Sequence, residues 1–491
     1  MKTELVSTSR FRVALLSATA LLGGCASVPD LGPQPVPRTA QSVAAAVTLA
    51  TNVPATWPAG EWWRAYGDPQ LDRLIEAGLA DSPDLAAAVA RVRSAQAQLR
   101  EAGAPLGPRG SVNASAGGIK QSYNNGIPPG FVPQGINDTA ALNLQLGFDL
   151  DLWGRNRAAL RAARLQADAA AFDLQQARLV IATAIAQSYA QYALASADRA
   201  VAARAASLRE QTRTLVQTRV SGGLDTQAQL QAAAAETASA RGDVAALDEQ
   251  IALARNSLAA LSGQGPDAGL ALGPPQLALL AAHGIPGDAT TELVARRPDI
   301  QSARVLIESA DQRIRVARAD YYPSINLNAL VGLQALGLGN LFKTGSAYGN
   351  AGPALNLPLF RGAELGGRYA GARAGFDEAV ARYDGAVLTA YREAADAVAS
   401  RAALAERLAQ SRAALTAARS AATLTDMRYR GGLGTYLDVL TVQRTALIAE
   451  RQVTDLEARV FLLDVQLVRA LGGGFSPDAA ATPPTKDIPH G

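Results

Sequence analysis

The sequence contains very few of the side chains that enzymes commonly use for catalysis or metal binding. Its 491 residues include one cysteine and two histidines. This leaves almost no material for a zinc site, an activated thiol or a serine–histidine–aspartate triad, so we expect no metal, no cofactor and no enzymatic activity. The histidines, His283 and His490, lie in a connector rich in proline and glycine and near the C-terminus, where we expect them to be solvated.

An excess of charge of one sign is also missing, and aromatic residues are scarce. The 46 basic and 43 acidic residues give a formal net charge of +3, without the basic footprint of a nucleic-acid-binding protein. Aromatic residues make up 5% of the chain, whereas hydrophobic residues make up 48%. Alanine and leucine carry this apolar content, which favours long helices over a conventional globular core.

Residues 1–24 have the features of a signal peptide. A basic stretch precedes an apolar run, Val13 to Leu22, that is shorter than the roughly 20 residues a membrane-spanning helix needs. Small residues then lead directly to Cys25, and this arrangement resembles the lipobox of bacterial lipoproteins. The resemblance implies that Cys25 becomes the lipid-modified N-terminus, and Ala26 after it favours the outer membrane. An ordinary signal peptide with a chance cysteine is the alternative.

Long apolar runs are absent after the signal peptide. No stretch beyond Ala26 reaches the roughly 18 apolar residues of a transmembrane helix. Any membrane crossing by the mature chain would therefore have to be made of strands.

Two halves of the chain repeat one plan. Residues 82–85 (SPDL) match residues 297–300 (RPDI), and residues 219–224 (RVSGGL) match residues 428–433 (RYRGGL). Matches that keep their order over such distances indicate a duplicated unit of roughly 200 residues rather than a solenoid of short repeats. Each copy is predicted to run helix, strand, strand, very long helix, Gly-Gly turn, helix.

This plan divides the chain into six segments. In order they are the lipoprotein signal peptide 1–24, a lipid-anchored linker 25–60, repeat 1 at 61–264, a connector 265–287, repeat 2 at 288–474, and a disordered C-terminal tail 475–491. The predicted strands lie at about 111–122 and 139–153 in repeat 1, and at about 324–335 and 350–360 in repeat 2.

The clearest strand alternates apolar and polar residues up to Leu152, with a strict period of two. Its apolar face, which we expect to contact lipid, is formed by Leu142, Leu144, Leu146 and Phe148, and its opposite face by Asn143, Gln145 and Asp149. About ten tilted residues are enough to cross a hydrocarbon core as a strand. A pair of half-buried hairpins in a soluble domain is the alternative.

The long proline-free segments predict very long helices. No proline occurs from Gln134 to Gly265 or from Leu359 to Ser476, so a helix over about Asn156–Val220 would extend roughly 100 Å. Four strands cannot close a barrel, because the smallest spanning barrels have about 8 strands and an open edge in lipid leaves backbone groups unpaired. Two chains would give a filled barrel, whereas three would give about 12 strands and an open channel. A mainly α chain that forms a trimeric, shared membrane β-barrel, continued by an α-helical barrel, is therefore favoured over a soluble helical rod.

Several motifs occur together along the chain. They are Trp62-Trp63, Asp68-Pro69, residues 82–85 (SPDL), residues 148–155 (FDLDLWGR), residues 295–300 (ARRPDI), residues 321–323 (YYP) and residues 359–362 (LFRG). As a set, from the lipobox to about Gly474, they are similar to the TolC/OprM-type outer-membrane efflux lipoproteins. The resemblance implies a homotrimer in the outer membrane of a Gram-negative bacterium, with a 12-stranded barrel in lipid and an α-helical tunnel through the periplasm.

The same resemblance implies a passive conduit rather than an enzyme. Substrates would come from an inner-membrane RND-type pump through a periplasmic adaptor, the membrane fusion protein. A conduit of the same fold that serves protein secretion, and a lipid-anchored periplasmic rod, are the alternatives. The strand segments argue against the rod.

The family's functional positions match this sequence in part. Tyr429 and Asp438 match the pattern with which members close the periplasmic end of the tunnel, although the alternative for Asp438 is a solvated acid on a helix face. Gly434 stands where some members carry an arginine, and Thr441 where a second aspartate is common, so the closure here is expected to be looser or built differently.

A glycine pair follows each of the longest predicted helices. Gly222-Gly223 and Gly431-Gly432 permit the positive φ of a helix C-cap and a reversal into the next helix. The resemblance implies that these two turns are the tips that dock the adaptor.

Overall fold

The computed structural model describes residues 27–49, 55–124, 126–275, 284 and 286–476. Cys25, His283 and His490, together with the predicted signal peptide and most of the C-terminal tail, lie outside the described residues.

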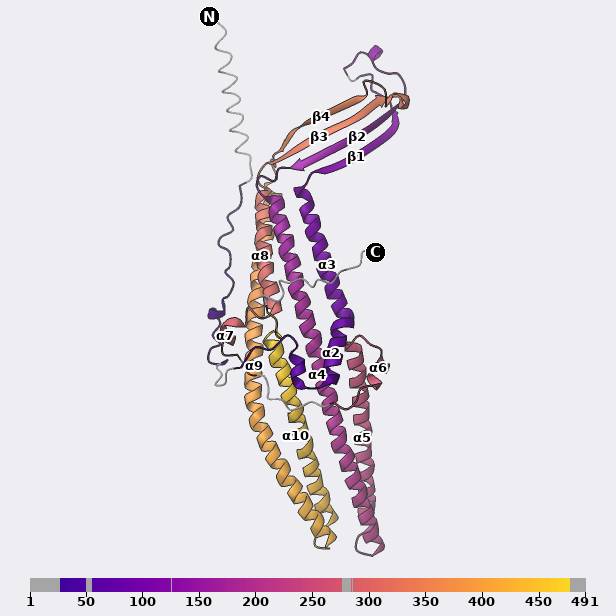
Figure 1. Cartoon of the computed structure of the whole chain (residues 1–491), viewed down its shortest axis with the longest axis vertical. Coiled ribbons are helices and arrows are strands. Elements are labelled where there is room, and N and C mark those ends of the chain that lie inside the picture. The colour runs from indigo at the N-terminus through magenta and orange to yellow at the C-terminus, as the bar shows by residue number, and fades with distance from the viewer. Residues whose placement is uncertain (1–26, 50–54, 125, 276–283, 285, 477–491) are drawn as a thin grey trace. The chain divides into compact units, whose positions relative to one another are not determined.

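The chain folds into long helices and four strands, as predicted (Figure 1). The helices and strands are α2 Pro69–Asp81, α3 Pro83–Gly103, β1 Arg109–Ile119, β2 Asn137–Asp149, α4 Arg155–Ser221, α5 Gln227–Leu261, α6 Pro266–Leu270, α7 Ala289–Glu292, α8 Pro298–Ala319, β3 Ser324–Leu336, β4 Ala347–Asn356, α9 Gly362–Arg430 and α10 Tyr436–Ala470. The two longest helices, α4 and α9, have 67 and 69 residues and occupy matching places in the two repeats.

The strand limits differ from the predicted ones. β2 ends at Asp149, although the apolar alternation continues to Leu152, because Asp151 has a left-handed φ of 44° that turns the chain toward α4. The Asp151 carboxylate accepts hydrogen bonds from the backbone N–H groups of Asn156 (2.8 Å) and Arg157 (3.1 Å), which caps the start of α4. β4 ends at Asn356, before the predicted limit at residue 360.

Contacts divide the chain into two units. Unit 1 contains Met1–Val36, Val92–Ala169 and Ala303–Arg382, and unit 2 contains Pro37–Arg91, Ala170–Ser302 and Tyr383–Gly491. The division falls within α3, α4, α8 and α9. Unit 1 therefore holds all four strands, and unit 2 holds both Gly-Gly turns.

The strands of unit 1 form one antiparallel sheet in the order β1-β2-β3-β4 (Figure 1). Its register continues the two faces of β2 into its neighbours. On the apolar face, Leu144 lies between Val112 and Val331, whereas on the other face Asn143 lies between Asn113 and Gly332. The sheet thus has one mainly apolar face and one more polar face, as the period of two requires.

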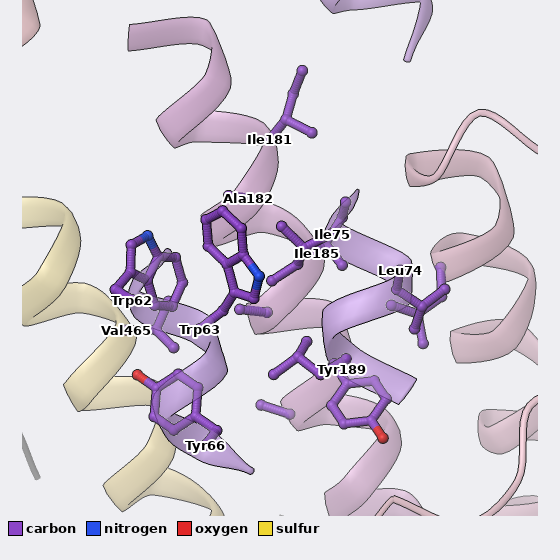
Figure 2. Close-up of a cluster of buried hydrophobic side chains, with 14 of the residues drawn as sticks. Trp62, Trp63, Tyr66, Leu74, Ile75, Ile181, Ala182, Ile185, Tyr189 and Val465 are labelled. Carbon is purple, nitrogen blue, oxygen red and sulfur yellow. The ribbon is translucent and has the colours of Figure 1, made fainter. Parts of the chain in front are cut away.

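The core of unit 2 is built around the first aromatic motif. Trp62, Trp63 and Tyr66 pack against Ile185 of α4 and Val465 of α10 (Figure 2). The buried Tyr66 hydroxyl donates a 2.7 Å hydrogen bond to Oδ2 of Asp464, and burial raises the pKa of this phenol. The aromatic motif therefore joins the N-terminal segment to both long-helix pairs of unit 2.

Ion pairs connect the helices of unit 2. Glu450 of α10 accepts from Arg204 of α4 (2.7 Å) and Arg419 of α9 (2.9 Å). Arg451 of α10 pairs with Asp243 of α5 at 3.2 Å. Each partly exposed pair contributes at most about 1 kcal/mol to the free energy of unfolding. These pairs therefore favour particular helix–helix contacts more than they stabilise the fold.

Arg297, in the motif ARRPDI, connects three helices of unit 2. Its guanidinium is buried and donates to Asp299 (2.7 Å), to Glu393 of α9 (2.7 Å) and to the carbonyl of Ala470 at the end of α10 (3.1 Å). One side chain thereby ties the start of α8 to α9 and α10, which a lysine could not do with the same geometry.

Candidate functional site

The two Gly-Gly turns have the same backbone geometry. Gly223 and Gly432 have φ values of 74° and 75°. The N–H of Leu224 donates to the carbonyl of Arg219, and the N–H of Leu433 to that of Arg428, at 2.8 Å in both turns. These bonds, with those of the two glycines one position earlier, form a Schellman C-cap at the end of α4 and of α9.

The helix that follows each turn starts with a capping box. Thr226 receives the N–H of Gln229 on its hydroxyl, and the Gln229 side chain accepts from the N–H of Thr226. Thr435 and Asp438 repeat this arrangement at the start of α10, with 2.9 Å between the Thr435 nitrogen and Asp438 Oδ2. The hydrogen bonds from Thr435 hold the pKa of the Asp438 carboxyl below its usual value. Asp438 is therefore a capping residue with an exposed side chain.

Tyr429 connects the two turns. The side chain is fully buried, and its hydroxyl donates a 2.6 Å hydrogen bond to Oδ2 of Asp225. The same oxygen accepts a 2.9 Å bond from Nε of Arg219, whose guanidinium carbon lies 4.7 Å from the centre of the Tyr429 ring. An ion pair, a phenol and a cation–π contact thus join the end of α4 to the end of α9.

These contacts favour the protonation states that the hydrogen bonds require. Burial, and then the hydrogen bond to Asp225, raise the pKa of the Tyr429 phenol, so the hydroxyl remains a donor. The hydrogen bond to Asp225 also raises the pKa of the Arg219 guanidinium. The side chains of Arg219 and Asp225 are only 15% and 6% exposed, which limits screening of their attraction by water and salt.

An apolar cluster surrounds this polar link. Its buried members are Val216, Leu230, Ala233, Tyr429, Tyr436 and Val439, from α4, α5, α9 and α10. The Tyr429 and Tyr436 rings lie 6.5 Å apart in a tilted arrangement. Separation of the two turns would expose this cluster, so packing and the polar link both favour contact between the turns.

The structure brings together only some of the residues selected from the sequence. Tyr429 packs between the turns, but its partners are Asp225 and Arg219, which the sequence interpretation missed. Thr441 bonds to the carbonyl of Leu437 on its own helix. The signal that could have identified this partner is a difference between the repeats: Asp225 follows the first turn, and Gly434 stands at the matching position after the second turn.

Exposed leucines lie in the two turns and at the start of α10. Leu224 is 69% exposed, Leu433 is 74% exposed and Leu437 is 68% exposed.

The other predicted sites lie elsewhere. Leu144, Leu146 and Phe148 are at least 36% exposed on the apolar face of β2. In the described ranges, no group of three or more histidine, cysteine or carboxylate side chains is placed to hold a metal ion. None of the helices in the described part of the chain is long and apolar enough to cross a membrane.

Known proteins match almost the whole chain. The family described as Outer membrane efflux protein matches residues 74–264 and 290–473. The multidrug resistance outer membrane protein MdtP of Shigella flexneri is 32% identical over 478 residues, covering 94% of this chain and 96% of MdtP.

Two solved structures share the fold. The outer membrane protein VceC of Vibrio cholerae is 39% identical with a TM-score of 0.81, covering 86% of this chain and 100% of VceC. The open state of the MtrE outer membrane channel of Neisseria gonorrhoeae is 25% identical with a TM-score of 0.75, covering 92% of this chain and 99% of MtrE.

Proposed function

Because this chain belongs to the outer membrane efflux protein family, we propose that it is a passive conduit through the outer membrane. An inner-membrane RND-type pump would deliver substrates to it through a periplasmic adaptor, and the chain itself would catalyse no reaction. The observation that carries this proposal is the two-faced sheet of unit 1, which has a lipid-compatible face and a polar face.

The sheet requires further copies of the chain. β1 and β4 are edge strands, and each is exposed along its whole length. Open edges are not stable in lipid, so β4 of one copy would pair with β1 of the next. We propose a homotrimer with about 12 strands, since two copies would leave little room for an open lumen.

The link between the two turns is proposed to be the gate of the conduit. Tyr429, Asp225 and Arg219 join the ends of α4 and α9, so their contacts would hold the α-helical barrel narrow. Three copies of Asp438 around one axis would form a ring of carboxylates that attracts cations. The low pKa of this carboxyl supports the ionised state that such a ring needs.

Two further contacts with partners are proposed. The turns at Gly222-Gly223 and Gly431-Gly432 would dock the adaptor, and their exposed leucines supply apolar surface for it. Cys25 would carry the lipid anchor in the outer membrane, with more than one acyl chain for stable attachment.

Planar-bilayer recordings test the conduit. The purified chain should insert as a trimer and give a weak, cation-preferring conductance at rest. Tyr429→Ala should raise the conductance, and Asp438→Asn should lower the cation preference. A protein that binds bilayers without any conductance would contradict the conduit and favour the lipid-anchored rod.

A further inference from the structure

A cavity of about 490 Å³ lies in unit 1 and is lined by residues from the ends of the strands and of the helices next to them. Strand residues with side chains on the polar face line part of it, among them Asp149, Asn326 and Asn328. Gly147 pairs with Asn328, and a Cβ at Gly147 would lie 3.5 Å from Asn328 Oδ1. The absent side chain thus leaves room in the cavity.

One wall of the cavity is aromatic. Trp153 and Tyr322 stack with 4.7 Å between ring centres and an angle of 23° between planes. The Trp153 indole N–H donates a 2.7 Å hydrogen bond to the carbonyl of Pro323, which fixes its orientation. Trp153 remains 52% exposed and Tyr322 40% exposed, so a flat apolar ring could pack on them.

The charged groups of the cavity differ in whether they have a partner. Arg155 lies 3.8 Å from Asp149 and 3.5 Å from Asp320, and Arg368 lies 3.6 Å from Asp320, so both carboxylates have a cationic partner. Arg361 and Arg368, which also line the cavity, pair with Glu364. Arg109, by contrast, has no ion pair or side-chain hydrogen bond within the described part of the chain.

Unused polar groups accompany Arg109. The side chains of Asn326, Asn328 and Asn356 line the cavity and make no hydrogen bond with any described residue. Arg109 and Asn328 are both in register with Gly147 of β2, so the guanidinium and the amide N–H of Asn328 face each other across a residue without a side chain, and both can donate to one carboxylate. A bound cation would find its carboxylates already paired.

We propose that this cavity binds aromatic carboxylates, with the ring against Trp153 and Tyr322 and the carboxylate at Arg109. The inference rests on the proposed function, because a ligand would reach this face of the sheet from the lumen of the conduit. The channel would retain substrates of this class briefly on their way out.

Calorimetric titration of the full-length protein in detergent tests the site with three aromatic probes of similar size and different charge. Benzoate should bind about tenfold more tightly than benzyl alcohol, because a charge-assisted hydrogen bond replaces a neutral one, and benzylammonium should bind least. Equal binding of benzoate and benzylammonium by the parent protein would overturn the proposal, and this comparison needs no variant.

Variants locate the site. Arg109→Gln should weaken benzoate to the level of benzyl alcohol, whereas Arg304→Gln, which removes an exposed arginine of α8 outside the cavity, should leave it unchanged. Gly147→Leu should fill the cavity and weaken both benzoate and benzyl alcohol at least tenfold. Unchanged benzoate binding in Arg109→Gln or Gly147→Leu would place the ligand elsewhere.

Bilayer conductance separates this proposal from the proposed function. A conducting protein that does not distinguish the three probes overturns the aromatic-carboxylate site alone. A protein without conductance overturns the conduit, whatever the probes do in detergent.

Discussion

The hydroxyl of Tyr429 lies 2.6 Å from Oδ2 of Asp225, a residue 204 positions earlier in the chain. One residue precedes the second Gly-Gly turn, and the other follows the first. Arg219 bonds to the same carboxylate oxygen, so this oxygen holds two donors from two helices. The energetic coupling of these three groups can be measured.

Removing either donor to Asp225 should favour the open channel, and removing Arg219 should have the larger effect. Tyr429→Phe loses one hydrogen bond to a charged group, about 1.5 kcal/mol, which is about tenfold in the open-to-closed ratio. Arg219→Gln should have a larger effect, about 3 kcal/mol, because it leaves the buried Asp225 charge without its cation. Single-channel open probability is the measurement. Arg213→Gln on the same helix, whose pair with Glu210 is more exposed, is the control and should resemble the parent.

The start of α10 should loosen in acid. The folded-state pKa of Asp438 is lowered, so its capping contribution is complete above the ordinary carboxyl value, about 4, and is lost as the pH falls through the lower folded value. Hydrogen exchange, corrected for intrinsic rates, should show reduced protection in the first turn of α10. The first turn of α5 has Gln229 in the same role and should show no such transition, nor should α10 in Asp438→Asn. An equal loss of protection in the first turns of α5 and α10 would mean that acid loosens the starts of both helices, independently of Asp438.

The two faces of β2 should respond differently to charge. Leu146→Arg should cost about 2–4 kcal/mol of barrel stability near mid-membrane, and Gln145→Arg much less. Unfolding of the protein in lipid vesicles by urea gives both values under one condition. Equal tolerance of the two arginines would show that β2 does not separate lipid from water.

The turn glycines should be sensitive to backbone strain rather than to crowding. No heavy atom beyond Gly432 and its two chain neighbours lies within 4 Å of the place where a Cβ would stand on Gly432, yet its φ is 75°. Gly432→Val should therefore strain the turn by about 1–2 kcal/mol and reduce cross-linking to the adaptor, with conductance retained. Gly431→Ala, at an ordinary φ with its Cβ 3.5 Å from the Met427 carbonyl, is the matched control. Normal cross-linking of Gly432→Val would place the docking surface elsewhere.

Mass spectrometry of the mature protein should find an acylated Cys25 at its N-terminus. Cys25→Ala should impair maturation but retain pore function in any processed fraction, because the strands themselves anchor the protein. Detection of an unmodified Cys25, or of cleavage at another position, would refute the lipid anchor.

Local patterns in the sequence were sufficient to predict the strands and long helices. The alternation from Leu142 to Phe148 and the absence of proline in α4 and α9 are properties of neighbouring residues, which the fold preserves. The end of β2 was missed because the alternation runs on into a turn. There, the left-handed Asp151 and its bonds to the start of α4 decide the limit.

The partners in the candidate gate could not be predicted in the same way. Asp225 follows a turn, where an acid is ordinarily solvated, and nothing near it in sequence indicates a buried tyrosine as its partner. The capping role of Asp438, by contrast, depends on a residue close to it in sequence. Its spacing after Thr435 fits a capping box, and the structure contains that box.

The link between the turns takes its acceptor from repeat 1 and its donor from repeat 2. At the matching positions, Gly434 stands for Asp225 and Val220 for Tyr429, while Arg219 is matched by Arg428. The duplicated halves have therefore divided one task between them and can no longer substitute for each other. A chain recombined from two first halves would have two acceptors and no phenol, and one from two second halves would have two phenols and no acceptor. The link between the turns therefore needs one copy of each half.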